Sequence, residues 1–347
     1  MKEKKIKLDK FNIAKNSKPL LIAEIGINHN GSLSLARKML NKAVDCGADI
    51  VKFQTHLVED EMLPSKNKKT GSHVKGSLFD ILKKCSLTKK DHINLQRLCK
   101  KRKVMFLSTP FSKEAVDLLT SIKVSAFKIG SGETKNYHFI EYILKKNKPT
   151  LISTGTSSWE DLLKFEKKFR KYKKNIILMQ CTSNYPTQNS DTNTGVVKLI
   201  RKKLGFIPGY SDHSKENISS LAAAVMGAKV IERHFTLSRK LPGIDQSSSL
   251  EPKEFLDLRI NIDKIYQTTG YDKIVNRESK NVINGFSQSI VTIKNIKKGE
   301  KLLPGKNIWY KRPGTGINAN KLFKIKNKKT IKNLQKDQLL KLSDFKK

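Results

Sequence analysis

Charged and polar side chains stand inside several apolar, strand-like segments of this chain, at places where an ordinary buried strand would carry Val or Ile. Lys52 and Gln54 have the same parity along one segment, and Glu232 and His234 have the same parity along another. Because alternate side chains of a strand point to the same side, both members of each pair can face one cavity. A buried ammonium requires an anionic partner. These segments therefore predict a site that binds an anionic group.

Two further kinds of chemistry are available from the same strand ends. His213 and His234 can hold a divalent metal ion through imidazole nitrogens, with coordination positions left open for catalysis. By spacing alone, however, each histidine is better explained as a packing residue, the usual role of a lone histidine. Glu24 is a candidate base or a partner to a metal-bound water, and Glu133 is a second candidate. A salt bridge to a buried lysine is the alternative role for both glutamates, and the two roles can coexist.

These residues belong to a chain in which short apolar segments alternate with longer amphipathic, Lys-rich ones, the pattern of βα units around a parallel sheet. Polar groups stand at the carboxyl end of every predicted strand, the rim where (β/α)8 barrels build their active sites. At the sixth strand these groups are Gln180 and Asn184. The predicted strands are 20–25, 49–54, 104–108, 126–129, 150–154, 176–181, 206–210 and 229–234, and the helical patterns include 33–47, 89–103, 113–122 and 218–227. We therefore predict an α/β chain with a (β/α)8 TIM barrel.

The pattern changes after the barrel, and the chain divides into four predicted parts. Residues 1–18 are predicted to form an N-terminal hairpin or cap, 19–268 the catalytic barrel, 269–285 a linker and 286–347 a small β-rich domain. Within the last part, Ile293–Leu302 and Ile331–Leu340 have similar turn-centred sequences. This similarity predicts a pseudo-symmetric fold for the C-terminal domain.

Composition limits the classes of function. The net charge is +39, with 70 Lys and Arg against 31 Asp and Glu, so a nucleic-acid partner has to be considered. Lys greatly outnumbers Arg, and no helix-turn-helix, zinc-finger or aromatic RNA-binding signature accompanies the basic runs, which argues against that partner. No apolar run is long enough to cross a membrane, and the first residues alternate between polar and apolar types, unlike the apolar region of a secretory signal. We expect a cytoplasmic protein whose four cysteines are reduced packing residues.

Several long motifs carry a resemblance to a known family. The chain resembles the N-acetylneuraminate (sialic acid) synthase family, and Tyr310–Gly316 is similar to the central motif of that family's C-terminal antifreeze-like (SAF) domain. The resemblance covers about residues 18 to 345, over all the predicted barrel strands. The other motifs that carry it are Ile22–Ser32, Val51–His56, Leu107–Ser112, Ala126–Glu133, Gly209–Ser214 and Glu232–Thr236.

The resemblance implies a reaction and a set of roles. It implies condensation of phosphoenolpyruvate with an N-acetylated hexose, such as N-acetylmannosamine or a related diacetamido sugar, and water. The products are a nonulosonic (sialic-type) acid and phosphate, with C–O cleavage of the phosphate ester. The implied phosphoenolpyruvate-binding residues are Lys52, Thr109, Lys128, Ser131, Ser153, Asn184 and Ser211, and the implied sugar-binding residues are Gln54, Tyr185, Asp245 and Arg312. The implied catalytic residues are Glu24, Glu133, His213 and His234, of which the two histidines bind Mn²⁺ or Mg²⁺.

The resemblance also implies an assembly, and it leaves alternatives open. In the family the residue matching Arg312 reaches the barrel mouth of the partner subunit, which implies a domain-swapped homodimer. A legionaminate- or pseudaminate-type synthase is an alternative. A keto-deoxy sugar phosphate synthase would share the barrel but would not need residues 286–345. The loop Gly71–Gly76 departs from the family pattern, since it offers Ser72 or His73 where the family often has Asn.

Overall fold

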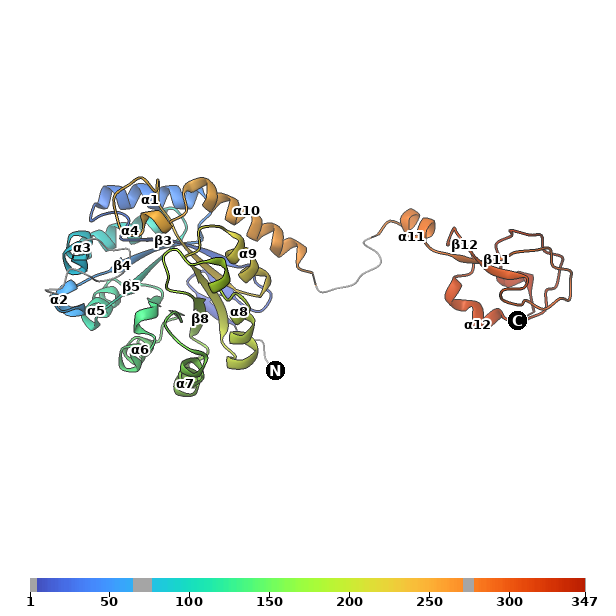
Figure 1. Ribbon diagram of the computed structural model, residues 1–347, viewed down its shortest axis with the longest axis horizontal. Helices are drawn as coiled ribbons and strands as arrows, with labels where there is room; N and C mark the ends of the chain where they lie inside the picture. The colour runs from blue at the N-terminus through green and yellow to red at the C-terminus, as the bar shows by residue number, and fades with distance from the viewer. Residues whose placement is uncertain (1–4, 65–76, 271–277, 347) are drawn as a thin grey trace. The chain divides into compact units, whose positions relative to one another are not determined.

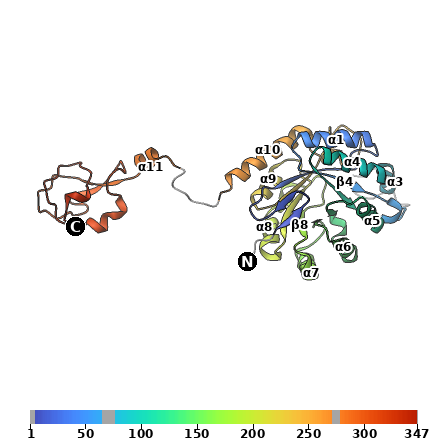
Figure 2. The ribbon, with the colours of Figure 1, turned by 180° about the vertical axis from the view of Figure 1, so that it is seen from behind.

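The computed structural model describes residues 5–64, 77–270 and 278–346, so the loop Gly71–Gly76 lies outside the described residues. The chain forms two compact units, Met1–Thr269 and Gly270–Lys347. In the first unit eight parallel strands follow the order β5-β4-β3-β10-β9-β8-β7-β6. The two end strands, β5 and β6, contact each other, so the sheet curls into a barrel with the helices outside it (Figures 1 and 2). The predicted fold class is confirmed.

All eight predicted strands are present within one or two residues of their predicted ends, and each is followed by at least one helix. The strands are β3 Leu20–Gly26, β4 Ile50–Thr55, β5 Met105–Pro110, β6 Phe127–Ile129, β7 Thr150–Ser153, β8 Ile176–Cys181, β9 Ile207–Asp212 and β10 Val230–His234. The helices are α1 Leu33–Asp45, α2 Val58–Glu61, α3 Leu78–Cys85, α4 Lys89–Lys101, α5 Lys113–Ser121, α6 Tyr137–Leu144, α7 Trp159–Phe169, α8 Gly195–Leu199, α9 Ile218–Val225 and α10 Pro252–Thr268.

Local sequence explains where these helices begin. Thr88 and Ser158 each accept a hydrogen bond from the backbone three residues on, at Asp91 and Asp161, whose carboxylates bond back to the cap. These capping boxes satisfy backbone donors that the first helical turn leaves free. The acidic residue in the first turn also interacts favourably with the helix dipole. The helices of the βα units are thus fixed at the end that adjoins the barrel mouth.

The inward-facing side chains of the barrel change from apolar to polar along each strand. In β3 the inward series is Leu20, Ile22 and Glu24; the first two belong to a buried apolar cluster inside the barrel. The hairpin formed by β1 Ile6–Leu8 and β2 Phe11–Ile13 contributes to the same cluster. The lower half of the barrel is therefore a packed core, and the carboxyl-end half is left for polar groups.

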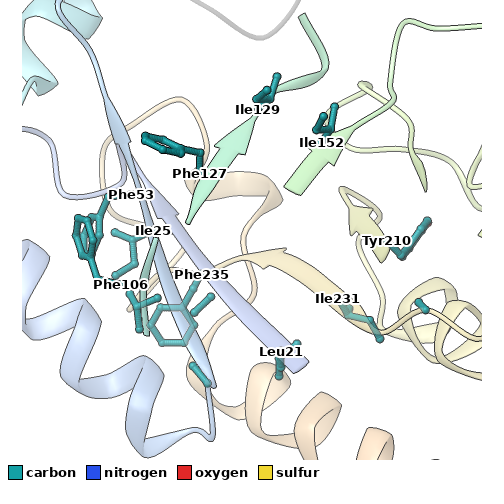
Figure 3. Packing of buried hydrophobic residues seen from close by; sticks show 14 of the residues in the cluster. Leu21, Ile25, Phe53, Phe106, Phe127, Ile129, Ile152, Tyr210, Ile231 and Phe235 are labelled. Carbon is teal, nitrogen blue, oxygen red and sulfur yellow. The ribbon is translucent and has the colours of Figure 1, made fainter. Parts of the chain in front are cut away.

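The outward-facing side chains of the strands form a second core against the helices. Figure 3 shows members of this cluster, among them Leu21, Phe53, Phe106, Ile231 and Phe235, gathered on the helix side of the sheet. Because neighbouring residues of a strand point in opposite directions, this core fixes which residues face the barrel interior. Placing Leu21 and Phe53 outward places Glu24 and Lys52 inward.

A buried ion pair joins β9 to β10 on this outer side. The Arg233 guanidinium is fully buried and donates to the Asp212 carboxylate at 2.6 Å. Asp212 also accepts from the hydroxyls of Ser219 and Ser220 on α9. Burial raises the pKa of Asp212, but Arg233 and the two serines outweigh burial, so the pKa lies below its usual value. The pair therefore stays charged and holds the two strands and α9 together.

The second unit contains α11 Lys280–Phe286, β11 Ser289–Thr292, β12 Ile308–Lys311 and α12 Leu322–Ile325. The two similar segments found in the sequence pair with each other: Ile296 and Leu334, at equivalent positions, exchange backbone hydrogen bonds of 2.9 and 2.8 Å. Gly299 and Asp337, also equivalent, both have positive φ. This pairing agrees with the predicted pseudo-symmetry. Residues 280–286 form a helix where the sequence suggested linker.

We predict that Asp212→Ala destabilises the barrel by about 3–5 kcal/mol, because it leaves the Arg233 guanidinium buried without its counter-ion. Urea and thermal denaturation followed by circular dichroism would measure the change. Glu59→Ala is the matched control, since its ion pair with Lys83 is solvent-exposed and its loss should leave the denaturation midpoint unchanged. Equal midpoints for the Asp212 variant and the parent protein would contradict the role assigned to this pair.

Candidate active site

A cavity of about 300 Å³ lies among the carboxyl ends of the barrel strands. Most of the residues proposed from the sequence line it. They are Glu24, Lys52, Gln54, Thr109, Lys128, Ser131, Glu133, Ser153, Tyr185, Ser211, His213 and His234. The first and last of these are far apart in the sequence, yet β3 and β10 are neighbours and His234 stands in register with Glu24. Closure of the barrel thus brings the strand ends to one site.

A larger hollow, of about 750 Å³, lies at the opposite end of the barrel beside the N-terminal hairpin. Its lining includes Lys10, Arg97, Lys100, Lys103 and Lys123, and none of the described residues that line it is a histidine or a glutamate. These cations are exposed on a strongly basic chain, and the hollow lacks a set of groups for proton transfer. The smaller cavity is therefore the candidate active site on chemical grounds, although it is not the largest.

Two lysines and two glutamates form a buried charge cluster in the smaller cavity. The Lys52 ammonium lies 3.2 Å from Glu24 Oε2 and 3.2 Å from Glu232 Oε1. The Lys128 ammonium lies 3.5 Å from the same Glu232 oxygen, which also accepts from the Ser211 hydroxyl at 3.2 Å. All four charged side chains are at most 5% exposed. One carboxylate, Glu232, thus serves both lysines.

The two lysines differ in how well their charge is compensated. Burial lowers the pKa of both, but at Lys52 the two neighbouring carboxylates outweigh burial and the pKa is raised. At Lys128, burial outweighs Glu232 and the pKa is lowered. Burial and repulsion by Glu232 raise the pKa of Glu24 despite the attraction of Lys52. An additional anion in the cavity would stabilise the ammonium of Lys128 most.

Several polar atoms around the cluster are buried and have no hydrogen-bond partner within the described residues. They include the Ser153 hydroxyl and Glu133 Oε2. Burial raises the pKa of Glu133, which makes this carboxyl better able to carry a proton near neutral pH. Buried polar groups are normally paired. Unpaired groups beside two ammoniums mark a place where a ligand's oxygens can bind.

His213 and His234 lie together at the cavity rim, with ring centroids 5.5 Å apart. The ring of Tyr185 is tilted by 32° against that of His213, with centroids 4.1 Å apart, and it meets the His234 ring edge-on at 5.9 Å. Within the described residues, no group of three or more His, Cys, Asp and Glu side chains is arranged to hold a metal ion. A metal here would therefore need oxygen ligands from substrate or water besides the two imidazoles.

Of these two histidines, His213 makes a hydrogen bond through Nδ1 and His234 Nδ1 makes none with the described residues. His213 Nδ1 donates to the Thr182 carbonyl at 2.8 Å, so in the neutral ring the free electron pair is at Nε2. Cys181 Sγ is 3.9 Å from the same Nδ1, a much weaker contact. His234 Nδ1 is buried without a hydrogen-bond partner in the described chain. Burial lowers the pKa of His234 to about 4, against the attraction of Asp245 at 3.9 Å.

Three of the residues proposed from the sequence do not line this cavity. Asn184 lines an adjoining hollow of about 590 Å³ that shares Thr156, Cys181 and Ser183 with it. Asp245 Oδ2 lies 3.9 Å from His234 Nδ1. Arg312 belongs to the second unit, where its guanidinium lies 5.3 Å from the centroid of the Phe286 ring.

One role and one residue of the site were not proposed from the sequence. Parity placed Glu232 facing the cavity, but its role as the shared partner of both lysines was not predicted. Cys181, and not Gln180, faces the cavity from β8; Gln180 instead donates to the Thr192 carbonyl at 3.3 Å. Because residues 176–179 are all apolar and buried, alternation of residue types gave no indication of which side faces inward.

Comparison with known proteins gives a consistent result. The NeuB family profile matches residues 39–273. The chain is 38% identical over 333 residues to N,N'-diacetyllegionaminic acid synthase of Campylobacter jejuni, covering 93% of this chain and 99% of that protein. It is 30% identical over 339 residues to pseudaminic acid synthase of the same species, covering 96% and 98%. The N-acetylneuraminic acid (sialic acid) synthetase structure from Leptospira borgpetersenii superimposes with a TM-score of 0.72 at 31% identity, covering 81% of this chain and 94% of that one.

Proposed function

Because this chain belongs to the NeuB family, we propose that it condenses phosphoenolpyruvate with an N-acetylated hexose and water. The products are a nonulosonic (sialic-type) acid and phosphate. Carbon 3 of phosphoenolpyruvate bonds to the sugar's aldehyde carbon, water adds at carbon 2, and the bridging oxygen leaves with phosphate. The observation that supports this reaction best is the buried cluster of Lys52, Lys128 and Glu232 beside two histidines. It combines a binding site for a multiply charged anion with groups for carbonyl activation.

The cations and hydroxyls of the cavity are assigned to phosphoenolpyruvate. Lys128, whose charge is the less compensated of the two lysines, gains most from an arriving carboxylate and phosphate. Lys52 also donates to the Thr109 hydroxyl at 3.2 Å, and the free hydroxyl of Ser153 offers a donor. The remaining residues proposed for this substrate are Ser131, Asn184 and Ser211. Fixed donors of this kind stabilise the charge of the departing phosphate without reorganisation.

The two carboxyl groups are assigned to proton transfer. Glu133, with its pKa raised by burial, can hold a proton close to the phosphate-binding lysines. Glu24 accepts from the Gln54 amide at 3.1 Å and is placed to take a proton from the attacking water. Glu24 also pairs with Lys52, so the pairing role and the catalytic role coexist in this proposal.

His213 and His234 are assigned as the metal-binding residues, with Mn²⁺ or Mg²⁺ as the proposed ion. A bound divalent ion supplies Lewis-acid polarisation of the sugar's carbonyl oxygen. The two imidazoles lie next to each other at the rim, and the Tyr185 ring packs against that of His213 with centroids 4.1 Å apart. These features suit a site whose other ligands come from substrate and water.

The sugar is assigned to Gln54, Tyr185 and Asp245, together with Arg312 from a partner subunit. This assignment treats residues 286–347 as an antifreeze-like (SAF) domain and the enzyme as a domain-swapped homodimer. The names of the relatives include legionaminic and pseudaminic acid synthases, so a diacetamido sugar is as good a candidate as N-acetylmannosamine. The four cysteines are buried and unpaired, in keeping with a role in the cytoplasm. In the described residues no helix could span a membrane.

We predict that the protein releases phosphate from phosphoenolpyruvate only when Mn²⁺ or Mg²⁺ and an N-acetyl sugar are both present. With phosphoenolpyruvate carrying ¹⁸O in the bridging position, the label should appear in phosphate, as C–O cleavage requires. Mass spectrometry of the phosphate would measure this, with N-acetylmannosamine and several diacetamido sugars supplied in turn. Stimulation by a phosphorylated aldose alone would instead support the keto-deoxy sugar phosphate alternative, and label missing from phosphate would contradict the proposed bond cleavage.

Metal binding can be tested apart from turnover. His234→Gln should weaken Mn²⁺ binding at least about tenfold, because it removes one of two imidazole ligands. The free Mn²⁺ signal in electron paramagnetic resonance would report the affinity. His138→Gln, which changes a histidine on exposed α6 surface, should bind as the parent does. Equal affinity of the two variants would remove His234 from the metal site.

Mixing two impaired variants, assayed with the sugar well below the KM of Arg312→Ala, tests the swapped arrangement. Arg312→Ala should raise the KM for the sugar while the barrel stays folded, and Lys128→Met should inactivate the barrel that carries it. If Arg312 acts on the partner's barrel, each mixed dimer regains one complete site, and an equimolar mixture recovers about a quarter of the parent activity after subunit exchange. A mixture that stays as inactive as its components, with exchange verified by mass spectrometry, would argue for action within one subunit.

A further inference from the structure

His56 and Glu61 lie behind the cavity wall and do not line it, yet an unbroken series of hydrogen bonds joins them to it. His56 Nδ1 lies 2.9 and 3.0 Å from the two carboxylate oxygens of Glu61. His56 Nε2 lies 2.8 Å from Gln54 Oε1, and Gln54 Nε2 donates to Glu24 Oε1 at 3.1 Å. The side chains of His56 and Glu61 are only 4% and 5% exposed. Solvent therefore has little access to this series.

The donors and acceptors in the series determine where hydrogen atoms must be. Gln54 directs its NH2 group at the Glu24 carboxylate, so its carbonyl oxygen faces His56. A carbonyl oxygen only accepts hydrogen bonds, so His56 Nε2 must carry a hydrogen. An ionised Glu61 also only accepts, so while Glu61 is ionised Nδ1 carries a hydrogen as well and Glu61 balances the charge of the ring.

The opposite orientation of the Gln54 amide is excluded while Glu24 is ionised. A His56 ring with hydrogen only on Nδ1 would present an electron pair at Nε2, and the amide would turn its NH2 group towards it. Gln54 Oε1 would then face Glu24 Oε1, and two acceptors at about 3 Å repel each other. The orientation of Gln54 thus depends on the hydrogen that His56 carries at Nε2.

Packing holds His56 in place for this purpose. Its ring is stacked on Phe111 with centroids 4.5 Å apart and an angle of 8° between the planes. Glu61 is the last residue of α2, directly after the strand that carries Lys52 and Gln54. Phe111 itself lines the cavity. The imidazole can therefore neither rotate away from Gln54 nor exchange Glu61 for water.

We infer that His56, held by Glu61, is a positioning residue of the active site: it fixes the Gln54 amide so that the NH2 group faces Glu24. This inference rests on the proposed function, in which Gln54 contacts the sugar and Glu24 accepts a proton. Because His56 holds the Gln54 amide in this orientation, the Gln54 NH2 group continues to donate to the Glu24 carboxylate. This hydrogen bond favours the ionised form of Glu24, which a base requires. The sugar, in turn, meets a Gln54 side chain held in one orientation.

The ring hydrogens can be observed directly, whether or not the protein turns over any sugar. In protein with ¹⁵N-labelled histidine, nuclear magnetic resonance should show both ring nitrogens of His56 protonated, with the resonances assigned by comparison with His56→Gln. In Glu61→Gln, which keeps the shape of the side chain but removes its charge, Gln54 retains the hydrogen at Nε2, so Nδ1 should shift towards the value of an unprotonated nitrogen. An unprotonated Nε2 in the parent protein would overturn the inference even if the proposed reaction is correct.

Kinetics separate positioning from a merely structural role. Glu61→Gln should lower kcat and raise the KM for the sugar, together by about tenfold or more in kcat/KM, because one hydrogen bond to a charged group is lost. The KM for phosphoenolpyruvate should stay within about twofold, since its lysines are unchanged. Glu59→Gln, on the exposed side of α2, is the matched control and should behave as the parent.

The outcomes remain distinguishable. If folded Glu61→Gln has the same kcat and KM values as the parent protein, the inference is overturned. It is also overturned if kcat/KM falls equally for the sugar and for phosphoenolpyruvate and the melting temperature is lowered, because that result indicates a structural role alone. If no sugar supports turnover in the parent protein, the proposed function fails, while the resonances of His56 still decide whether its ring holds Gln54 in the stated orientation.

Discussion

The burial of four charged side chains in the barrel mouth is the constraint on which the rest of this structure depends. Removing ions from water costs several kcal/mol each, and the cost is offset only when each ion meets a partner at short range. Here Glu232 lies between Lys52 and Lys128, and Glu24 lies on the other side of Lys52. Such an arrangement tolerates little displacement. The strands that carry these residues must be held rigidly, which explains the dense apolar packing below and outside them.

The positive charge of Lys128 is not fully compensated by the neighbouring carboxylate. This incomplete compensation distinguishes a ligand-binding site from a structural ion pair. Asp212 and Arg233, also buried, satisfy each other and the neighbouring serines almost fully. Around Lys128, by contrast, Ser153 and Glu133 keep polar atoms without partners in the described chain. A fully satisfied pair stabilises the fold whether or not a ligand is present. A buried cluster that lacks some of its hydrogen-bond and charge partners is stabilised when a ligand supplies them. The cost of burying Lys128 without full compensation therefore contributes to affinity for an anion.

The sequence was sufficient to predict the barrel because each predicted strand is a short apolar run with polar residues at or near its carboxyl end. The prediction from parity was correct at Lys52 and Gln54, where polar and apolar residues alternate, and at Glu232 and His234, although Arg233 between them is also charged. It failed at Cys181, since a strand buried on both faces carries no alternation. The role of Glu232 could not be predicted either: β10 meets β4 and β6 across the barrel, and a pairing across a closed sheet leaves no local pattern. Asn184 lies beyond the strand end, where the chain follows the rim towards His213.

Strands β9 and β10 show how stability and chemistry are combined in one stretch of sequence. Along β9 and just beyond its end, Ser211 and His213 point into the cavity and Asp212 points outward; along β10, Glu232 and His234 point inward and Arg233 outward. The outward residues bond to each other and lock the two strands in register. That register determines the 5.5 Å separation of the two imidazole rings on the inner side. The outer ion pair and the inner histidines therefore form one unit, in which residues that never touch the cavity set the geometry of those that do.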